Sequence, residues 1–269
     1  MRVFVLGSGS TGNCLVLEAE GERLLIDAGI GPNRATARMR GLGGELVASR
    51  APLGLFVTHD HGDHAAHAVP IARALRAPLY AHPGIRLDRR AKRVELVPFV
   101  PGRPVVLGPF VIETLVIPHD ALQIAVRVTA GGRRFGIATD LGHVTRELRA
   151  LLRGCDLVML EANYCPELLE SGPYPPRLKQ RVAGPIGHLA NAQAADLAAS
   201  LEDTRVSRLV LAHLSRTNNT PDRALSTVTA RLRRLPVEAL LQGEARRLDV
   251  SGVPDARRLA HGEQLGFSF

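Results

Sequence analysis

The sequence predicts an α/β protein in which two β-sheets pack face to face and helices cover their outer faces. Two observations indicate this fold class. Apolar strand-like runs alternate with helical patterns in both halves of the chain, and a strand-rich stretch at residues 94–138 lies between the halves. The length of 269 residues suits one large domain. We expect that domain to occupy residues 1–248 and the polar, Arg-rich residues 249–269 to form a tail.

The first half begins with a strand at residues 2–7, and a glycine-rich loop at residues 7–13 follows it. Alternating apolar residues at 14–19 and 23–28 predict a hairpin across Glu20-Gly21-Glu22. The other elements expected in this half are strands at 53–57 and 79–81 and helices at 33–40 and 69–75. The elements expected in the second half are strands at 111–117, 134–138, 157–161 and 208–212 and helices at 146–152, 192–201 and 221–234.

One stretch, Thr58-His59-Asp60-His61-Gly62-Asp63-His64, concentrates metal-binding side chains between an apolar strand and the start of a helix. Side chains alternate along a strand, so His59 and His61 project to the same side, and the turn that follows brings Asp63 and His64 back toward them. Imidazole together with carboxylate suits zinc, iron or manganese. So many histidines and carboxylates gain little from burial unless a cation pairs with them.

Three further candidate ligands, His119, Asp140 and His213, each follow an apolar run and precede a loop. Taken singly, a residue of this kind is more often a cap or a satisfied core residue. Taken with the first stretch, the three complete two metal sites. The first site comprises His59, His61 and His119, the second comprises Asp63, His64 and His213, and Asp140 bridges them. We therefore predict two divalent cations, Mn²⁺ or Zn²⁺ or else iron, about 3.5–4 Å apart.

These motifs resemble those of the metallo-β-lactamase superfamily. The resemblance implies a four-layer αββα sandwich over nearly the whole chain, with Asp27 as a carboxylate that braces the histidine loop. A closer resemblance is to the YycJ/WalJ branch, whose members the resemblance identifies as 5′→3′ exonucleases on double-stranded DNA linked to mismatch repair. The segments that carry it are residues 7–13, Pro118-His119-Asp120-Ala121, residues 161–164, 171–175 and 178–181, Gly187-His188-Leu189-Ala190-Asn191 and residues 212–219.

Phosphate handling supports the nuclease interpretation. We expect Asn191 to cap a helix at residues 192–201, whose free N–H groups attract a phosphate oxygen. His188 just before it is a candidate to stabilise the scissile phosphate or to protonate the leaving oxygen. The alternative is a histidine packed beside a helix start. Ser215, Asn218 and Asn219 follow the ligand His213 and offer neutral donors to a phosphodiester.

The net charge of +8 favours a polyanionic partner such as nucleic acid, although the Arg-rich habit of a GC-rich genome explains it equally well. Two basic runs are candidate contacts for a DNA backbone, and the alternative for each is a solvated surface. The first run is Arg177, Lys179 and Arg181, and the second is Arg86, Arg89, Arg90, Lys92 and Arg93.

Other features predict a cytoplasmic location. No window approaches 18 uninterrupted apolar residues, and the N-terminus enters a strand directly without a signal peptide. Cys14, Cys155 and Cys165 are odd in number and scattered, which fits a reducing compartment.

The last residues, Gln264–Phe269, resemble the peptide with which bacterial repair proteins bind the replicative sliding clamp. The alternative is a chain end that packs on the body.

Two other classes of function remain open from the sequence. The same scaffold and metals suit a small-molecule hydrolase such as a thioesterase, lactonase or cyclic phosphodiesterase, and turnover of such substrates would indicate it. A non-catalytic regulator that keeps its metals structurally is the third hypothesis, for which metal binding without turnover would be the sign. Charge and the family resemblance favour the nuclease.

Overall fold

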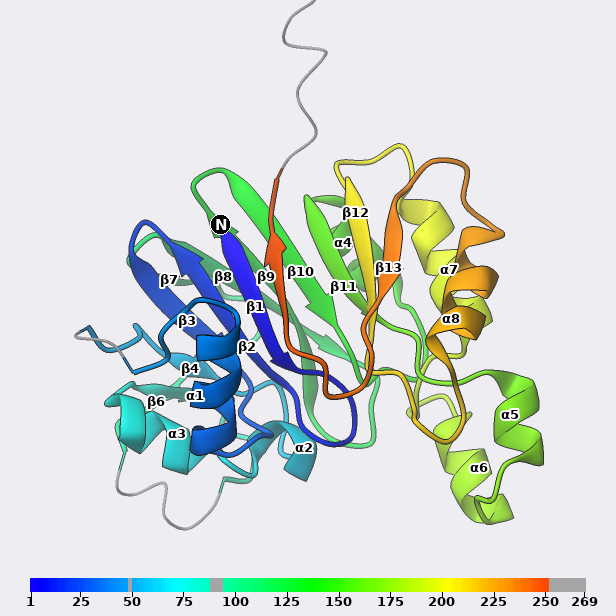
Figure 1. Ribbon diagram of the computed structural model, residues 1–269, viewed down its shortest axis with the longest axis horizontal. Coiled ribbons are helices and arrows are strands. Elements are labelled where there is room, and N and C mark those ends of the chain that lie inside the picture. Colours follow the sequence, from blue (N-terminus) through cyan, green and yellow to red (C-terminus); the bar gives the residue numbers. More distant parts are fainter. Residues whose placement is uncertain (48–49, 88–93, 252–269) are drawn as a thin grey trace, which may run out of the picture.

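The computed structural model describes residues 1–47, 50–87 and 94–251. Two seven-stranded sheets lie face to face with helices on their outer faces, so the predicted αββα sandwich is confirmed (Figure 1). No helix in these three ranges has the length and apolar character needed to cross a membrane. Most of the second predicted basic run and the clamp-like segment Gln264–Phe269 lie outside the described residues.

The strands of the first sheet are β1 (Arg2–Gly7), β2 (Cys14–Ala19), β3 (Glu22–Ile26), β4 (Leu55–Phe56), β5 (Leu79–Ala81), β6 (Leu96–Pro98) and β14 (Arg246–Asp249). Their order is β14-β1-β2-β3-β4-β5-β6, antiparallel from β14 to β3 and parallel from β3 to β6. Strand β14, in which Asp249 pairs with Arg2, was not expected from the sequence. Strand β14 covers the edge of β1 and extends to Asp249. The expected domain boundary after residue 248 therefore falls inside this strand.

The strands of the second sheet are β7 (Val105–Leu107), β8 (Phe110–Ile117), β9 (Gln123–Ala130), β10 (Arg133–Ala138), β11 (Leu157–Glu161), β12 (Arg208–Ala212) and β13 (Val237–Ala239). Their order is β13-β12-β11-β10-β9-β8-β7, parallel from β13 to β10 and antiparallel from β10 to β7. The parallel strands β10, β11 and β12 end at one edge of the sheet, where loops carry functional groups in α/β folds.

The helices are α1 (Pro32–Gly41), α2 (Gly62–Ala65), α3 (Ala68–Leu75), α4 (Arg146–Arg153), α5 (Pro166–Ser171), α6 (Pro176–Val182), α7 (Asn191–Leu201) and α8 (Pro221–Thr229). Three apolar cores hold the layers together. Phe56 and Phe110 belong to the core between the sheets, Met39 of α1 packs on the first sheet, and Leu197 of α7 packs on the second. Burial of each such side chain contributes roughly 1.5–3 kcal/mol.

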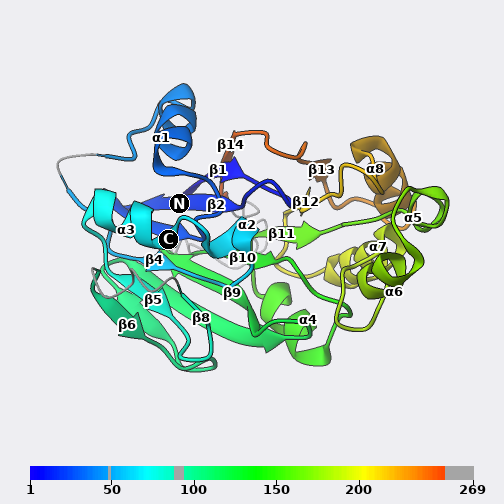
Figure 2. The same cartoon turned by 90° about the horizontal axis from the view of Figure 1, so that it is seen from below.

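Two short helices, α5 and α6, were not expected from the sequence. They project at the end of the sandwich that also carries α2, as both views show (Figures 1 and 2). Proline at the start of each helix suits the first turn, where a backbone N–H has no partner within the helix. This end of the molecule therefore gains a wall that the second sheet alone does not provide.

Helix α8 is shorter than the expected helix at residues 221–234. It ends at Thr229 because the chain beyond it has another set of hydrogen-bond partners. Glu202 Oε1 accepts from the backbone N–H groups of residues 233–235 at 2.9 to 3.1 Å. A carboxylate thus takes the place of the helical carbonyls.

The three cysteines are free and buried, and the reactivity of Cys14 and Cys155 tests this packing. Burial raises the pKa of Cys14 and of Cys155 to about 12. Only a thiolate attacks a disulfide reagent, so we predict that neither residue reacts in the native protein at pH 8. Mass-spectrometric mapping of labelled cysteines checks this, with the guanidinium-unfolded chain as the positive control. Rapid native labelling of either residue would contradict the packing described here.

Candidate metal centre

The seven predicted ligands converge at one end of the sandwich, each on a loop that follows a strand or on α2. These residues are His59, His61, Asp63, His64, His119, Asp140 and His213. Two of them, Asp140 and His213, have positive φ angles of 58° and 54°, as does Asp27 with 61°. Left-handed backbone is costly for such residues and clusters at functional sites. At Asp27 it also ends β3 at Ile26, before the predicted limit of that strand.

The ligand atoms fall into two groups, within each of which they lie no more than 4.8 Å apart. The first group is His59, His61 and His119, and the second is Asp63, His64, Asp140 and His213. His213 Nε2 is 3.4 Å from Asp63 Oδ2 and 3.4 Å from Asp140 Oδ1. His64 Nε2 is 3.1 Å from Asp140 Oδ2. The structure thus brings the predicted ligands together in two groups, but it places Asp140 with the second group only. Asp140 and His213 also form a further group with Glu161 and His188.

Behind the ligands, oxygen atoms fix which nitrogen of each imidazole carries a proton. His64 Nδ1 donates to Asp27 Oδ2 at 2.7 Å, and Asp27 also accepts from the backbone and hydroxyl of Thr58 at 2.8 and 2.9 Å. His119 Nδ1 donates to the Gly187 carbonyl at 3.1 Å. With the outer nitrogen protonated, the inner nitrogen of each ring turns its lone pair toward the centre.

Glu161 is a site residue that was not expected from the sequence. It ends β11, is fully buried, and its Oε1 accepts from His188 Nδ1 at 2.8 Å and from His213 Nδ1 at 3.0 Å. Its Oε2 accepts from the backbone of Leu141 and Leu189 at 3.2 and 3.1 Å. The signal was present, because a carboxylate ends an otherwise apolar strand in line with Asp140 and His213.

The donor atoms fit divalent cations. Burial and the neighbouring His64 lower the pKa of His59 to about 2, so this ring is neutral, yet its Nε2 is buried without a hydrogen-bond partner. Asp140 Oδ2 is also buried, and it faces His64 Nε2 at 3.1 Å. Burial disfavours charge on His64, but Asp27 and Asp140 outweigh this and raise its pKa to about 10. Without a metal ion, a proton on His64 Nε2 supplies the positive charge that faces Asp140, and a divalent cation bound there can take the place of this proton.

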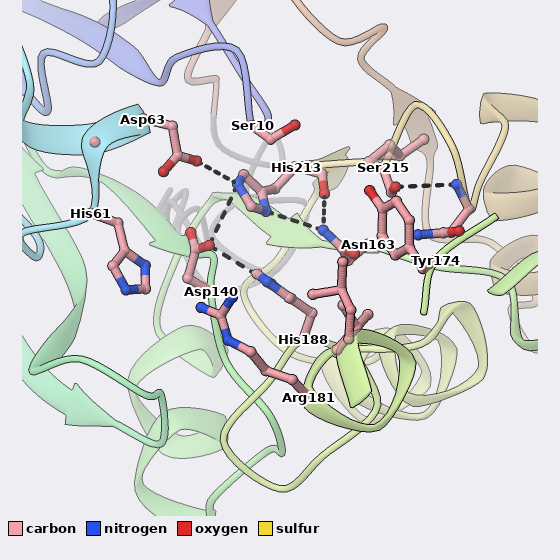
Figure 3. A pocket seen from close by; sticks show the side chains of 15 residues that line it. Ser10, His61, Asp63, Asp140, Asn163, Tyr174, Arg181, His188, His213 and Ser215 are labelled. Atoms are coloured by element: carbon pink, nitrogen blue, oxygen red, sulfur yellow. Dashed lines mark hydrogen bonds and ion pairs between the residues drawn. The ribbon is translucent and has the colours of Figure 1, made fainter. Parts of the chain in front are cut away.

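A cavity of about 350 Å³ opens beside the second group. Figure 3 shows Asp140, His188 and His213 turned toward one another on its floor. Of the predicted substrate contacts, Arg181, His188, Ser215 and Asn218 line this cavity. It therefore joins candidate metal ligands to groups that can bind phosphate.

Two predicted substrate contacts do not face this cavity. The Asn219 side chain is buried and bonds to Asn191 and to the Ala162 carbonyl, so it holds loops together instead. Lys179 donates to the Glu170 carbonyl across the α5–α6 turn. The expected cap is also wrong, because Ala190 is the N-cap of α7 and the Asn191 N–H donates to Tyr164.

The glycine-rich loop at residues 7–13 supports the centre from the first sheet. Asn13 Nδ2 is 2.7 Å from His64 Nε2 and donates to the Asp63 carbonyl at 3.2 Å, while Ser8 Oγ accepts from the His213 backbone at 2.9 Å. Gly29 lies against the same segment, and a Cβ there would be 1.7 Å from the Asp63 carbonyl oxygen. Only glycine allows this approach.

This contact predicts the effect of Gly29→Ala. The added methyl group must displace the Asp63 backbone, so we expect the variant to bind less metal and to melt at a lower temperature. Metal analysis after dialysis and a thermal melt measure both effects. Gly41→Ala, at the end of α1 with open space around its Cβ position, is the matched control and should lower neither. Wild-type metal content in Gly29→Ala would contradict this account of the loop.

Comparisons with known proteins agree with this geometry. Residues 22–214 match the model of the beta-lactamase superfamily domain. The chain is 30% identical to the exodeoxyribonuclease WalJ of Streptococcus pneumoniae over 243 residues, covering 85% of this chain and 87% of that protein. It is 29% identical to the exodeoxyribonuclease YycJ of Bacillus anthracis, covering 84% and 86%.

Among solved structures, the metallo-beta-lactamase fold protein YhfI from Bacillus subtilis superposes with a TM-score of 0.69 at 19% identity, covering 91% of this chain and 98% of that one. This likeness shows the fold alone. The family match and the two curated relatives go further. The chain therefore belongs to the metallo-β-lactamase superfamily, resembles WalJ and YycJ over most of its length, and is a metal-dependent hydrolase.

Proposed function

We propose that the protein is a binuclear phosphodiesterase that degrades double-stranded DNA from its 5′ ends and serves mismatch repair. The observation that carries the proposal is the position of two ligand groups beside a cavity lined by His188 and Arg181. The names of the two exodeoxyribonucleases that cover most of this chain support DNA as the substrate. The excess of positive charge is consistent with a polyanionic substrate.

The ligand groups suit Mn²⁺ or Zn²⁺. When bound, two such ions would activate a water molecule and neutralise charge on the phosphoryl oxygens. The carboxylates Asp63 and Asp140 would help to hold them, together with the histidines of both groups. Asp27 and Glu161 keep the rings of His64 and His213 in place through their outer nitrogens. The protein's own contribution is therefore a fixed ligand geometry that needs little rearrangement when substrate binds.

His188 is placed to move a proton. Its Nδ1 is held by Glu161, which leaves Nε2 for the cavity that the ring lines. Burial opposes a charged ring, but the adjacent Glu161 carboxylate outweighs this effect and raises the pKa of His188 above its ordinary value. A protonated imidazole in this position can donate to the leaving oxygen of a phosphodiester.

His188→Ala tests this role through the leaving group. Loss of a general acid should lower kcat on DNA by about 10²–10⁴-fold. Hydrolysis of bis(p-nitrophenyl) phosphate should fall far less, because p-nitrophenolate leaves without a proton. Bound metal should stay at the wild-type level. An equal loss on both substrates, or a loss of metal, would show that His188 acts in another way.

The nuclease itself is tested on linear duplex DNA labelled at either end, in the presence of Mn²⁺. We expect progressive loss of label from the 5′ end, abolished by Asp63→Ala. Asp60→Ala is the matched control, because Asp60 lies in the same loop but accepts from the Arg86 backbone at 3.3 Å, outside the ligand groups. Intact DNA with metal bound, together with turnover of a thioester, lactone or cyclic phosphodiester, would favour a small-molecule hydrolase.

A further inference from the structure

Asp120 is a carboxylate at the rim of the metal centre, outside both ligand groups. It follows His119 in the loop between β8 and β9, and its side chain is 20% exposed. Its two oxygens have different partners. Oδ1 faces the first histidine group, and Oδ2 faces Arg181 of α6. The side chain thus touches both the metal ligands and a residue of the cavity wall.

On the cavity side, Asp120 fixes a guanidinium. Arg181 Nε and one of its terminal nitrogens both lie close to Asp120 Oδ2, at 2.7 and 2.6 Å. A guanidinium held along one edge presents its remaining N–H groups in a constant direction. Arg181 lines the cavity, and Figure 3 shows it extending from α6 toward Asp140. Its free N–H groups are therefore available to an oxygen of a bound phosphate.

On the metal side, Asp120 faces an imidazole. Oδ1 is 3.4 Å from His61 Nε2 and 3.3 Å from His119 Nε2. His61 Nδ1 lies 3.3 Å from His119 Nε2, so it is the nitrogen that points into the ligand group. The proton of His61 then sits on Nε2 and points to Asp120. A carboxylate behind a ligating histidine fixes its ring and strengthens it as a ligand.

Stability does not account for this arrangement. The Arg181 side chain is 58% exposed, and ion pairs of exposed arginines contribute little to folding. Glu113 and Arg127 form an ion pair with similar distances, 2.7 and 2.6 Å, but this pair lies away from the metal centre. It therefore serves as a comparison for an ion pair without a contact to metal ligands. What distinguishes Asp120 is the contact of its other oxygen with the ligand histidines His61 and His119.

We propose that Asp120 is a positioning residue that couples phosphate binding by Arg181 to the orientation of His61. The ligand is a phosphate oxygen, whether of a monoester or a diester. The proposal rests on the proposed phosphodiesterase activity but does not require DNA. It predicts that one substitution, at Asp120, weakens both phosphate binding and metal binding, whereas substitution of Arg181 weakens phosphate binding alone.

The test uses the metal-loaded protein with inorganic phosphate as the probe, measured by calorimetry, and metal affinity measured by chelator competition. Asp120→Ala should weaken phosphate binding and metal binding by about tenfold each. Arg181→Ala should weaken phosphate binding as much and leave metal affinity unchanged. Asp120→Asn keeps an oxygen for His61 but presents an amide N–H to Arg181. It should restore metal affinity while phosphate binding stays weak.

The double variant Asp120→Ala/Arg181→Ala should bind phosphate no more weakly than the worse single variant, because the two residues act as one unit. Glu113→Gln, which breaks the comparison pair, should change neither affinity.

Multiplied effects in the double variant would overturn the proposal, as would unchanged metal affinity in Asp120→Ala. Loss of a whole equivalent of bound metal in Asp120→Ala at saturating metal would make Asp120 a ligand instead. If the phosphate and metal affinities change as predicted but the protein does not digest DNA, the result contradicts the proposed nuclease activity and leaves the role of Asp120 intact.

Discussion

The burial of carboxylates among imidazoles at one end of the sandwich is the constraint on which the site depends. Asp27, Asp140 and Glu161 are each at most 2% exposed. Burial favours the neutral carboxyl, but the imidazoles of His213 and His64 hold the pKa of Asp140 well below its ordinary value. Charges of this kind persist in an interior only when they are paired or bind a cation. Two seven-stranded sheets supply the rigid frame that keeps them together.

The frame also explains why each group comes from a different segment. Strands that run in the same direction end at one edge, so Asp140, Glu161 and His213 emerge side by side from β10, β11 and β12. The left-handed backbone at Asp140 and His213 then turns the chain sharply after each strand. That backbone conformation costs on the order of 1–3 kcal/mol per residue, and the packing around each residue must offset this cost.

Much of the fold and of the metal cluster could be predicted from the sequence because the signals are local. The spacing of His59, His61, Asp63 and His64 places them within one turn of chain, and apolar runs before the other ligands mark strand ends. The second sheet's β10 to β12 followed from the same runs. Glu161 could have been found by this rule, since it too ends an apolar strand.

Other features could not be predicted because they depend on tertiary contacts. Asn219 looks like a substrate donor in the sequence, but its amide is used by Asn191 and Ala162. The Lys179 side chain points toward the Glu170 carbonyl of α5, and the sequence of α5 has no clear periodic pattern from which this helix could be predicted. The strand β14 forms only because β1 offers it an edge. The contact of Asp120 with Arg181 joins residues 61 positions apart and leaves no mark in the sequence.

The most direct test of the central claim is the anomalous diffraction of crystals grown with Mn²⁺. The account predicts two peaks about 3.5–4 Å apart with Asp140 between them. One peak should lie among His59, His61 and His119, and the other should lie among Asp63, His64 and His213. A single peak would contradict the binuclear centre. A peak among Asp140, Glu161, His188 and His213 would instead contradict the proton-donor role of His188, because that residue would then be a ligand.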